Sequence, residues 1–264
     1  MNLAECKGNW ALVTGASAGI GREFCVQLAA AGMNLVLVAR TEKLLESLGA
    51  ELTSRHGIQI LAMATDLSRP DAAAELRSRL ASPGVKIRLL VNNAAFGRWG
   101  RFEATGAESY EEMIRLNTAA MVSMCHHFLP DLTSFPTSAI INVSSPAALQ
   151  PVPYMAVYAA TKAFVHSFSL ALYEEWSDRG VLVQTLCPGP TATEFDARAG
   201  AYESALREER GSPKYVVEAS LSRLAKGNPL VITAKGTYKQ RFFAGLFPAT
   251  MVIREVGKMF KPPD

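Results

Sequence analysis

Short apolar runs alternate with amphipathic stretches along almost the whole chain. Seven runs are rich in Val, Leu and Ile and have the length of strands that are buried on both faces. They lie at Trp10–Thr14, Leu35–Val38, Ile60–Thr65, Leu89–Val91, Ile140–Val143, Val181–Leu186 and Leu230–Thr233. Because strands and helices alternate without a repeat or a linker, we expect one doubly wound Rossmann-type α/β domain. Its seven-stranded parallel sheet would carry helices on both faces.

The stretches between these runs predict helices with identifiable start and stop signals. Ser68 and Asp71 have the spacing of a capping box, so a helix is expected to start there. Pro130 is expected to stop the long helix before it. The predicted helices are one with apolar Phe24, Cys25 and Leu28 that ends at Gly32, then Lys43–His56, the helix from Ser68, Tyr110–Phe128 and Tyr158–Arg179.

The composition limits the classes of function. The 264 residues carry 27 basic and 24 acidic side chains, and this net charge of +3 is too balanced to indicate a nucleic-acid partner. Four widely spaced cysteines and four histidines show no metal-ligand spacing, which favours reduced thiols and no metal site. Neither a signal peptide nor a membrane-spanning run is evident, so a soluble, cytoplasmic protein is expected.

A glycine-rich sequence, TGASAGIG, follows the first strand and precedes the first helix. Strand, glycine turn and helix form the context that a dinucleotide-binding motif requires. Gly15 permits the tight turn, while Gly19 and Gly21 let the backbone approach a pyrophosphate. The start of the helix supplies free N–H groups for the phosphates.

The end of the second strand indicates which dinucleotide is preferred. An enzyme for NAD usually places a carboxylate here for the ribose 2′-OH, and Ala39 offers none. Arg40 offers a planar donor fork that suits a 2′-phosphate. We therefore expect NADP(H) to be preferred over NAD(H).

The stretch from Ser145 to Lys162 carries the candidate chemistry. Tyr158 and Lys162 are four residues apart, so a helix places them on one face. A lysine cation stabilises a phenolate, so we expect Lys162 to lower the pKa of Tyr158. Ser145, at the end of the preceding strand, can hold a substrate oxygen on which charge develops. Tyr154 is a competing phenol, but it has no lysine four residues on.

Two asparagines follow the fourth strand. Asn92 and Asn93 lie where open α/β sheets bind ligands, and their amides are expected to brace the cofactor loop. Ala94 or Ala95 would leave room for the cofactor.

Taken together, these motifs resemble those of a classical short-chain dehydrogenase/reductase over nearly the whole chain. The matching residues are TGASAGIG at Thr14–Gly21, Asp66, NNAA at Asn92–Ala95, Asn117, Ser145, YAATK at Tyr158–Lys162 and PGPTAT at Pro188–Thr193. One departure is Ala95, where the family usually has glycine.

The resemblance implies a catalytic tetrad of Asn117, Ser145, Tyr158 and Lys162. Tyr158 would be the acid–base, Ser145 would position the carbonyl, and Asn117 would hold a water in the proton relay. Lys162 would also bind the nicotinamide ribose. Asp66 would meet the adenine and Thr193 the carboxamide. The expected cofactor contacts are Gly15, Ser17, Gly19, Ile20, Gly21, Arg40, Asp66, Asn93, Ala94, Tyr158, Lys162, Pro188, Gly189, Thr191 and Thr193.

The expected activity is the NADPH-dependent reduction of a ketone or aldehyde on a small, lipophilic substrate, or the reverse alcohol oxidation. Within a single domain of residues 1–264, substrate specificity is expected at Pro146–Pro153 and in a lid region at about 193–226. The apolar residues there are Val152, Met155, Phe195, Tyr202 and Leu206. We also expect a homodimer or homotetramer.

The C-terminal extension at about 235–264 leaves alternatives open. It combines apolar residues, among them Phe242, Phe243 and Met259, with basic ones, and Pro248 interrupts it. It is either a lid, a subunit contact, or an interfacial helix with weak membrane contact. The last would favour a membrane-surface 3-oxoacyl or keto-steroid reductase. A non-catalytic NADP-binding redox sensor is a further alternative.

Overall fold

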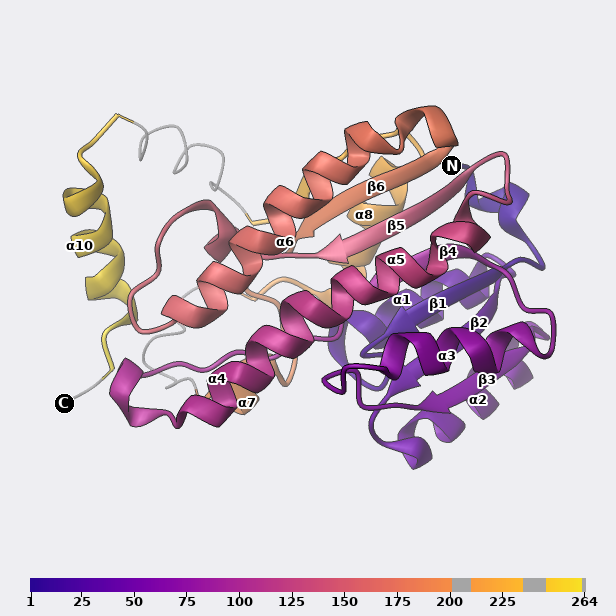
Figure 1. The fold of residues 1–264 in the computed structure, drawn as a ribbon, viewed down its shortest axis with the longest axis horizontal. Coiled ribbons are helices and arrows are strands. Elements are labelled where there is room, and N and C mark those ends of the chain that lie inside the picture. The colour runs from indigo at the N-terminus through magenta and orange to yellow at the C-terminus, as the bar shows by residue number, and fades with distance from the viewer. Residues whose placement is uncertain (201–209, 235–245, 263–264) are drawn as a thin grey trace.

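Seven parallel strands form the central sheet in the order β3-β2-β1-β4-β5-β6-β7 (Figure 1). The computed structural model describes residues 1–200, 210–234 and 246–262. All seven predicted strands are present, and each begins within two residues of its expected start. Their bounds are β1 Trp10–Thr14, β2 Asn34–Ala39, β3 Ile60–Ala64, β4 Ile87–Asn92, β5 Ser138–Val143, β6 Val181–Cys187 and β7 Leu230–Ile232.

Helices cover both faces of the sheet, which explains why the strands read as continuous apolar runs. One face packs against α1 Gly19–Ala30, α2 Glu42–His56 and α8 Pro213–Leu224. The other packs against α3 Ala72–Ala81, α5 Ala120–Leu132 and α6 Ala156–Glu175. The doubly wound fold expected from the sequence is confirmed.

The strand order places a crevice at the carboxyl ends of the strands, between β1 and β4. The chain runs from β1 to β2 and β3 on one side and then returns to β4 on the other side of β1. Ligands bind at such a reversal, outside the carboxyl ends of the strands.

The start of α3 differs from the prediction. Asp71 precedes the helix, but its side chain makes no capping hydrogen bond. The Ser68 hydroxyl instead donates to Asp66 Oδ1 over 2.8 Å. The expected capping box is therefore wrong, because a nearer carboxylate takes the serine hydroxyl.

The long helix predicted at Tyr110–Phe128 is also different. It consists of α4 Ala107–Ile114, one π-helical turn at Arg115–Ala119, and then α5. Pro130 lies inside α5, which ends at Leu132. Pro130 removes only the hydrogen bond to the His126 carbonyl, and the last turn still closes, because both the N–H and the hydroxyl of Thr133 donate to the Leu129 carbonyl over 2.9 and 3.0 Å. The helix consequently continues past the predicted stop.

Two helices lie beside the sheet's crevice. The short α7, Phe195–Ala199, and α10, Ala249–Phe260, are separate from the layers that cover the sheet (Figure 1). Pro248 immediately precedes α10, as its position in the sequence suggested. Among the described residues, none of the helices combines the length and apolar character needed to cross a lipid bilayer.

Candidate active site

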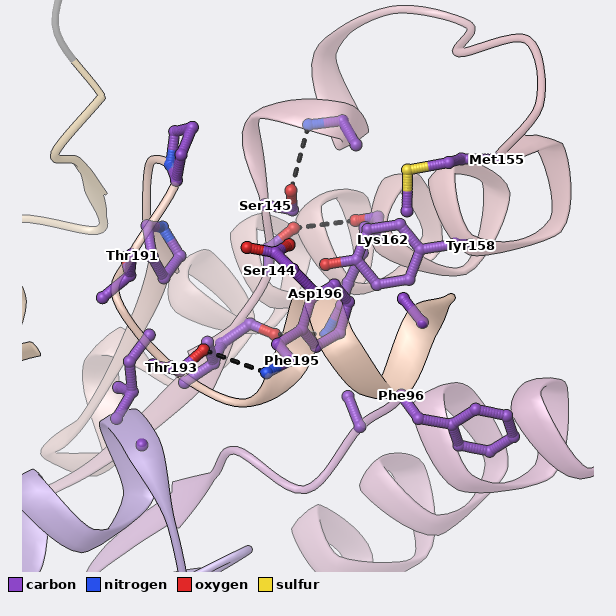
Figure 2. Close-up of a pocket in the computed structure, with 18 of the residues that line it drawn as sticks. Phe96, Ser144, Ser145, Met155, Tyr158, Lys162, Thr191, Thr193, Phe195 and Asp196 are labelled. Atoms are coloured by element: carbon purple, nitrogen blue, oxygen red, sulfur yellow. Dashed lines mark hydrogen bonds between the residues drawn. The ribbon is translucent and has the colours of Figure 1, made fainter. Parts of the chain in front are cut away.

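A large cleft of about 2330 Å³ runs along the carboxyl ends of the strands. Residues that directly follow every strand line it: Gly15, Arg40, Thr65, Asn93, Ser144, Pro188 and Thr233. Of the predicted site residues, all border this cleft except Gly21 and Asn117, which lie behind its wall. Figure 2 shows the part of the cleft around Tyr158.

The glycine loop has the geometry of a phosphate cradle. Gly15 and Gly19 have φ values of +67° and +54°, which side chains rarely tolerate. A Cβ on Gly21 would lie 2.2 Å from the Gly15 carbonyl oxygen, so the loop closes only with glycine there. Ala18 precedes α1 and makes no side-chain cap, which leaves the first N–H groups of the helix for a ligand. The loop thus fits the pyrophosphate of a dinucleotide.

Asn93 and Thr14 hold this loop in place. Asn93 Nδ2 donates to the Thr14 carbonyl over 3.0 Å, and the backbone N–H groups of Asn93 and Ala94 donate to the Thr14 hydroxyl. The bracing role expected of the asparagines is therefore met by Asn93. Asn92 is different, because its amide donates to Asn142 Oδ1 inside the core.

At the end of β2, the cleft brings Arg40 together with the carboxylates of Asp66 and Glu112. The Arg40 side chain is 70% exposed, and its guanidinium lies 3.8 Å from Glu112. Burial acts to raise the pKa of Asp66, but hydrogen bonds from Ser68 and the nearby charge of Arg40 bring it below its usual value. Arg40 is thus available to a ligand at the end of β2.

Lys162 is buried, with 3% of its surface exposed. Its Nζ donates to the Val143 carbonyl over 2.9 Å, and the Ser144 hydroxyl donates to the Lys162 carbonyl. Burial lowers the pKa of Lys162 to about 8. The ammonium is therefore mostly charged at neutral pH and loses its proton far more readily than an exposed lysine.

Tyr158 lies close to both of its predicted partners. Its ring centroid is 5.7 Å from Lys162 Nζ, and Ser145 lies near enough to its hydroxyl to influence the pKa of the phenol. Burial raises the pKa of Tyr158 to about 12, although the Ser145 hydroxyl acts in the opposite direction. The expected lowering by Lys162 is therefore wrong for this structure, because burial dominates the shift and the charge of Asp196 adds to it. As a result, the phenol keeps its proton at neutral pH.

Asn117 lies in the π-helical turn, behind Tyr158. Its amide donates to the Phe96 carbonyl and to the Thr161 hydroxyl, and its Oδ1 accepts from the Phe96 N–H. A void of about 10 Å³ separates Asn117 from Lys162, which is about the space of one water molecule.

Three residues shape the surroundings of Tyr158, and the sequence had singled out only Phe195 among them. Phe195 packs its ring 5.3 Å from that of Tyr158. A Cβ on Gly97 would lie 2.9 Å from Phe195 Cζ and 3.3 Å from Tyr158 Cδ2, so Gly97 must remain small. Asp196 also points into this pocket (Figure 2), and its negative charge contributes to the raised pKa of Tyr158. The sequence carried no signal for Gly97 or Asp196, because their roles depend on tertiary packing.

The predicted specificity regions are only partly described. Val152, Met155 and Phe195 border the cleft as expected. Tyr202, Leu206, Phe242 and Phe243 lie outside the described residues. Within the expected lid region, α7 borders the cleft, and so does the start of α8 at Tyr215 and Val216, while the rest of α8 packs into the core.

Comparison with known proteins gives a consistent family. The family model described as short chain dehydrogenase matches residues 9–203. A 7beta-hydroxysteroid dehydrogenase from Collinsella aerofaciens is 30% identical over 229 residues, which are 86% of each chain. A very-long-chain 3-oxoacyl-CoA reductase from Laccaria bicolor is 39% identical over 184 residues, or 68% of this chain. The match spans only 54% of that reductase.

A solved structure extends the likeness to three dimensions. A short-chain dehydrogenase from Sphingobium yanoikuyae in complex with NADPH superposes with a TM-score of 0.81 and 33% identity. The superposition covers 90% of this chain and 93% of the other.

Proposed function

This chain belongs to the short-chain dehydrogenase family, and we propose that it uses NADPH to reduce the ketone of a lipophilic substrate. It is an oxidoreductase that interconverts alcohol and carbonyl groups with a nicotinamide dinucleotide. The observation that carries the proposal is the meeting of Ser145, Tyr158 and Lys162 in the cleft that also contains the glycine loop.

The chain's own residues supply the proton for this reaction, and the bound nicotinamide would supply the hydride. Tyr158 holds a proton at neutral pH and is placed to donate it to the substrate oxygen. The Ser145 hydroxyl donates to the same oxygen as negative charge grows there. Lys162 offers a cation that stabilises the phenolate left on Tyr158. The reverse transfers would oxidise an alcohol.

Asn117 fits a role in returning a proton to Tyr158. The void beside it is also lined by Lys162 and by Asn92, whose buried Oδ1 accepts no hydrogen bond from the described residues. A water there would connect Asn117 with Lys162. Asn117→Ala should therefore slow turnover while leaving the affinity for NADPH within about threefold of wild type.

The preference for NADPH rests on Arg40 at the end of β2. Its exposed guanidinium borders the cleft, and Ala39 leaves no carboxylate for a ribose 2′-OH. One charge-assisted contact to a 2′-phosphate contributes roughly 1.5–3 kcal/mol. NADPH should thus bind about tenfold or more tightly than NADH, and Arg40→Ala should remove most of that difference. Fluorescence titration measures both dissociation constants, and a wild-type preference for NADH would contradict this interpretation.

The lipophilic substrate is supported by the walls of the cleft around Tyr158. Val152, Met155 and Phe195 surround the catalytic ring with apolar surface. The names of two relatives, a hydroxysteroid dehydrogenase and a very-long-chain 3-oxoacyl-CoA reductase, describe lipophilic substrates. Aliphatic ketones, keto-steroids and 3-oxoacyl thioesters should be assayed by the loss of NADPH absorbance. Absence of turnover across all three classes would refute the proposal and favour a non-catalytic redox sensor.

A membrane-surface reductase is a second candidate, favoured by apolar side chains at the cleft's mouth. Leu246, Phe247, Met251 and Met259 are all exposed, and Arg254 and Lys258 lie among them. Salt-sensitive flotation with anionic vesicles would support this candidate. No binding at low ionic strength would exclude it.

A homodimer or homotetramer is supported by the outer surface of α4 and α6. Ile114 and Phe164 are exposed there, and Phe164 stacks on Phe168 to form an apolar surface suited to a second copy. Sedimentation velocity should show an assembled species that Phe164→Glu shifts toward the monomer.

A further inference from the structure

We propose that α10 and Trp99 form the outer wall of the substrate site and bind the apolar part of a ketone that lies away from its carbonyl. This inference rests on the proposed ketone reduction and adds a substrate class to it. The substrate would be a ketone with an extended, largely apolar skeleton, such as a long alkyl chain or fused rings.

The inner side of α10 continues the apolar surface that begins at Tyr158. Val256 is only 6% exposed and packs in one cluster with Val152, Met155 and Tyr158. Val252 and Phe260 pack against the same cluster and border the cleft. The wall is therefore continuous from the catalytic ring to the C-terminal helix.

A short segment, Gly97–Gly100, fixes α10 relative to the catalytic residues. Trp99 Nε1 donates to the Phe260 carbonyl over 2.8 Å, and the two rings lie 5.3 Å apart. The Trp99 N–H donates to the Ala199 carbonyl at the end of α7 over 2.9 Å. The Gly100 N–H donates to the carbonyl of Tyr154, which lies just before α6. Trp99 and Gly100 together thus connect three walls of the cleft.

The size of the cleft supports a large substrate. Its volume of about 2330 Å³ exceeds the roughly 300–1,000 Å³ of an ordinary ligand pocket, which leaves space beyond the dinucleotide. On α10, Glu255 and Lys258 also border the cleft, but they are largely exposed and pair with each other over 2.6 Å. The apolar residues of α10 can then face the substrate without an unpaired carboxylate among them.

The test is a series of methyl ketones from four to twelve carbons, assayed with saturating NADPH. All members present the same carbonyl to Tyr158, so only contact with the far wall changes. For wild type, kcat/KM should rise about two- to fourfold for each methylene that reaches α10. Val252→Glu should reduce the ratio of long-chain to short-chain kcat/KM by at least tenfold. Trp99→Phe keeps an aromatic ring but loses the N–H, and it should reduce the same ratio about threefold or more through KM.

Arg254→Ala is the matched control, because Arg254 is exposed on the same helix and does not border the cleft. It should keep the wild-type dependence on chain length. An NADPH titration of each variant checks that the cofactor site is intact, and Trp99→Phe carries the test if Val252→Glu does not fold.

The outcomes separate the two proposals. Suppose that wild type reduces ketones but that Val252→Glu and Trp99→Phe both keep its dependence on chain length. The proposed outer wall is then refuted, and the ketone reduction stands. If wild type reduces ketones with no dependence on chain length, the outer wall is likewise refuted. If wild type reduces no ketone of the series and none of the wider panel, both proposals fail.

Discussion

Burial, more than the interaction between the two side chains, determines the protonation states of Tyr158 and Lys162. Tyr158 and Lys162 are neighbours, yet the pKa of the phenol rises and that of the ammonium falls, as expected when desolvation disfavours both charged forms. Lys162 Nζ donates its hydrogen bond to the Val143 carbonyl and not to the phenolic oxygen in this structure. Tyr158 is therefore protonated in the resting state, which is the form that the reduction of a carbonyl requires.

Replacing Tyr158 by phenylalanine should separate chemistry from binding. Tyr158→Phe removes the transferable proton but keeps the ring that packs on Phe195. Turnover should fall by about 10²–10⁴, the usual contribution of a positioned acid, while NADPH affinity stays nearly unchanged. Stopped-flow turnover and a fluorescence titration measure the two effects. Tyr154→Phe is the control and should cost little, and a Tyr158→Phe enzyme of near wild-type rate would disprove the mechanism.

The pH dependence of the reduction should follow Lys162. Its lowered pKa of about 8 means that the cation is present below pH 8 and is lost above it. Tyr158, with a pKa of about 12, keeps its proton throughout this range. We expect kcat/KM to be level from pH 6 to about 7.5 and to decline above about 8. Lys162→Arg keeps the charge, so its residual activity should lack that decline.

At the scale of elements, the strands were predictable because the residues of each strand alone show that both of its faces are buried. A run such as Leu35–Val38 is apolar at every position, since both faces of the sheet are covered. Helix ends were less predictable, because they depend on partners elsewhere. Ser68 bonds to Asp66, and α5 passes Pro130 to reach contacts on α3 and β4. Such competition between local and tertiary partners is not visible in a sequence motif.

The extension of α5 past Pro130 has a consequence for stability. It buries Asp131 to 2% exposure, where its carboxylate accepts from Arg77 over 2.6 Å and from the Ile87 N–H over 3.1 Å. Asp131→Ala would leave that N–H and a half-buried guanidinium without a partner. We expect a loss of about 2–4 kcal/mol in the free energy of unfolding, measured by urea denaturation. Glu51→Ala removes exposed ion pairs with Arg22 and Arg55 and should cost less than about 1 kcal/mol.

At the scale of the whole molecule, the predicted site residues lie together because all strands point the same way. Gly15, Asn93 and Ser145 are far apart in sequence, yet each follows the carboxyl end of a parallel strand. Motifs at strand ends could therefore be assigned to one site from the sequence. The contact of Trp99 with Phe260 spans 161 residues and follows no motif, so the outer wall required the structure.

The same arrangement predicts how the cofactor should affect the stability of the whole protein. Residues after all seven strands line the cleft, so a dinucleotide that fills it bridges both halves of the sheet and binds only the folded state. At a concentration one hundred times its dissociation constant, a ligand stabilises the folded state by about 2.7 kcal/mol. For a domain of this size that corresponds to a rise of roughly 5–10 °C in Tm.

Differential scanning fluorimetry should show a larger rise with NADPH than with equimolar NADH, and Arg40→Ala should abolish the difference. Arg254→Ala, outside the cleft, should behave as wild type. Equal shifts for both cofactors in wild type would show that Arg40 does not read the 2′-phosphate, even if the cleft binds a dinucleotide.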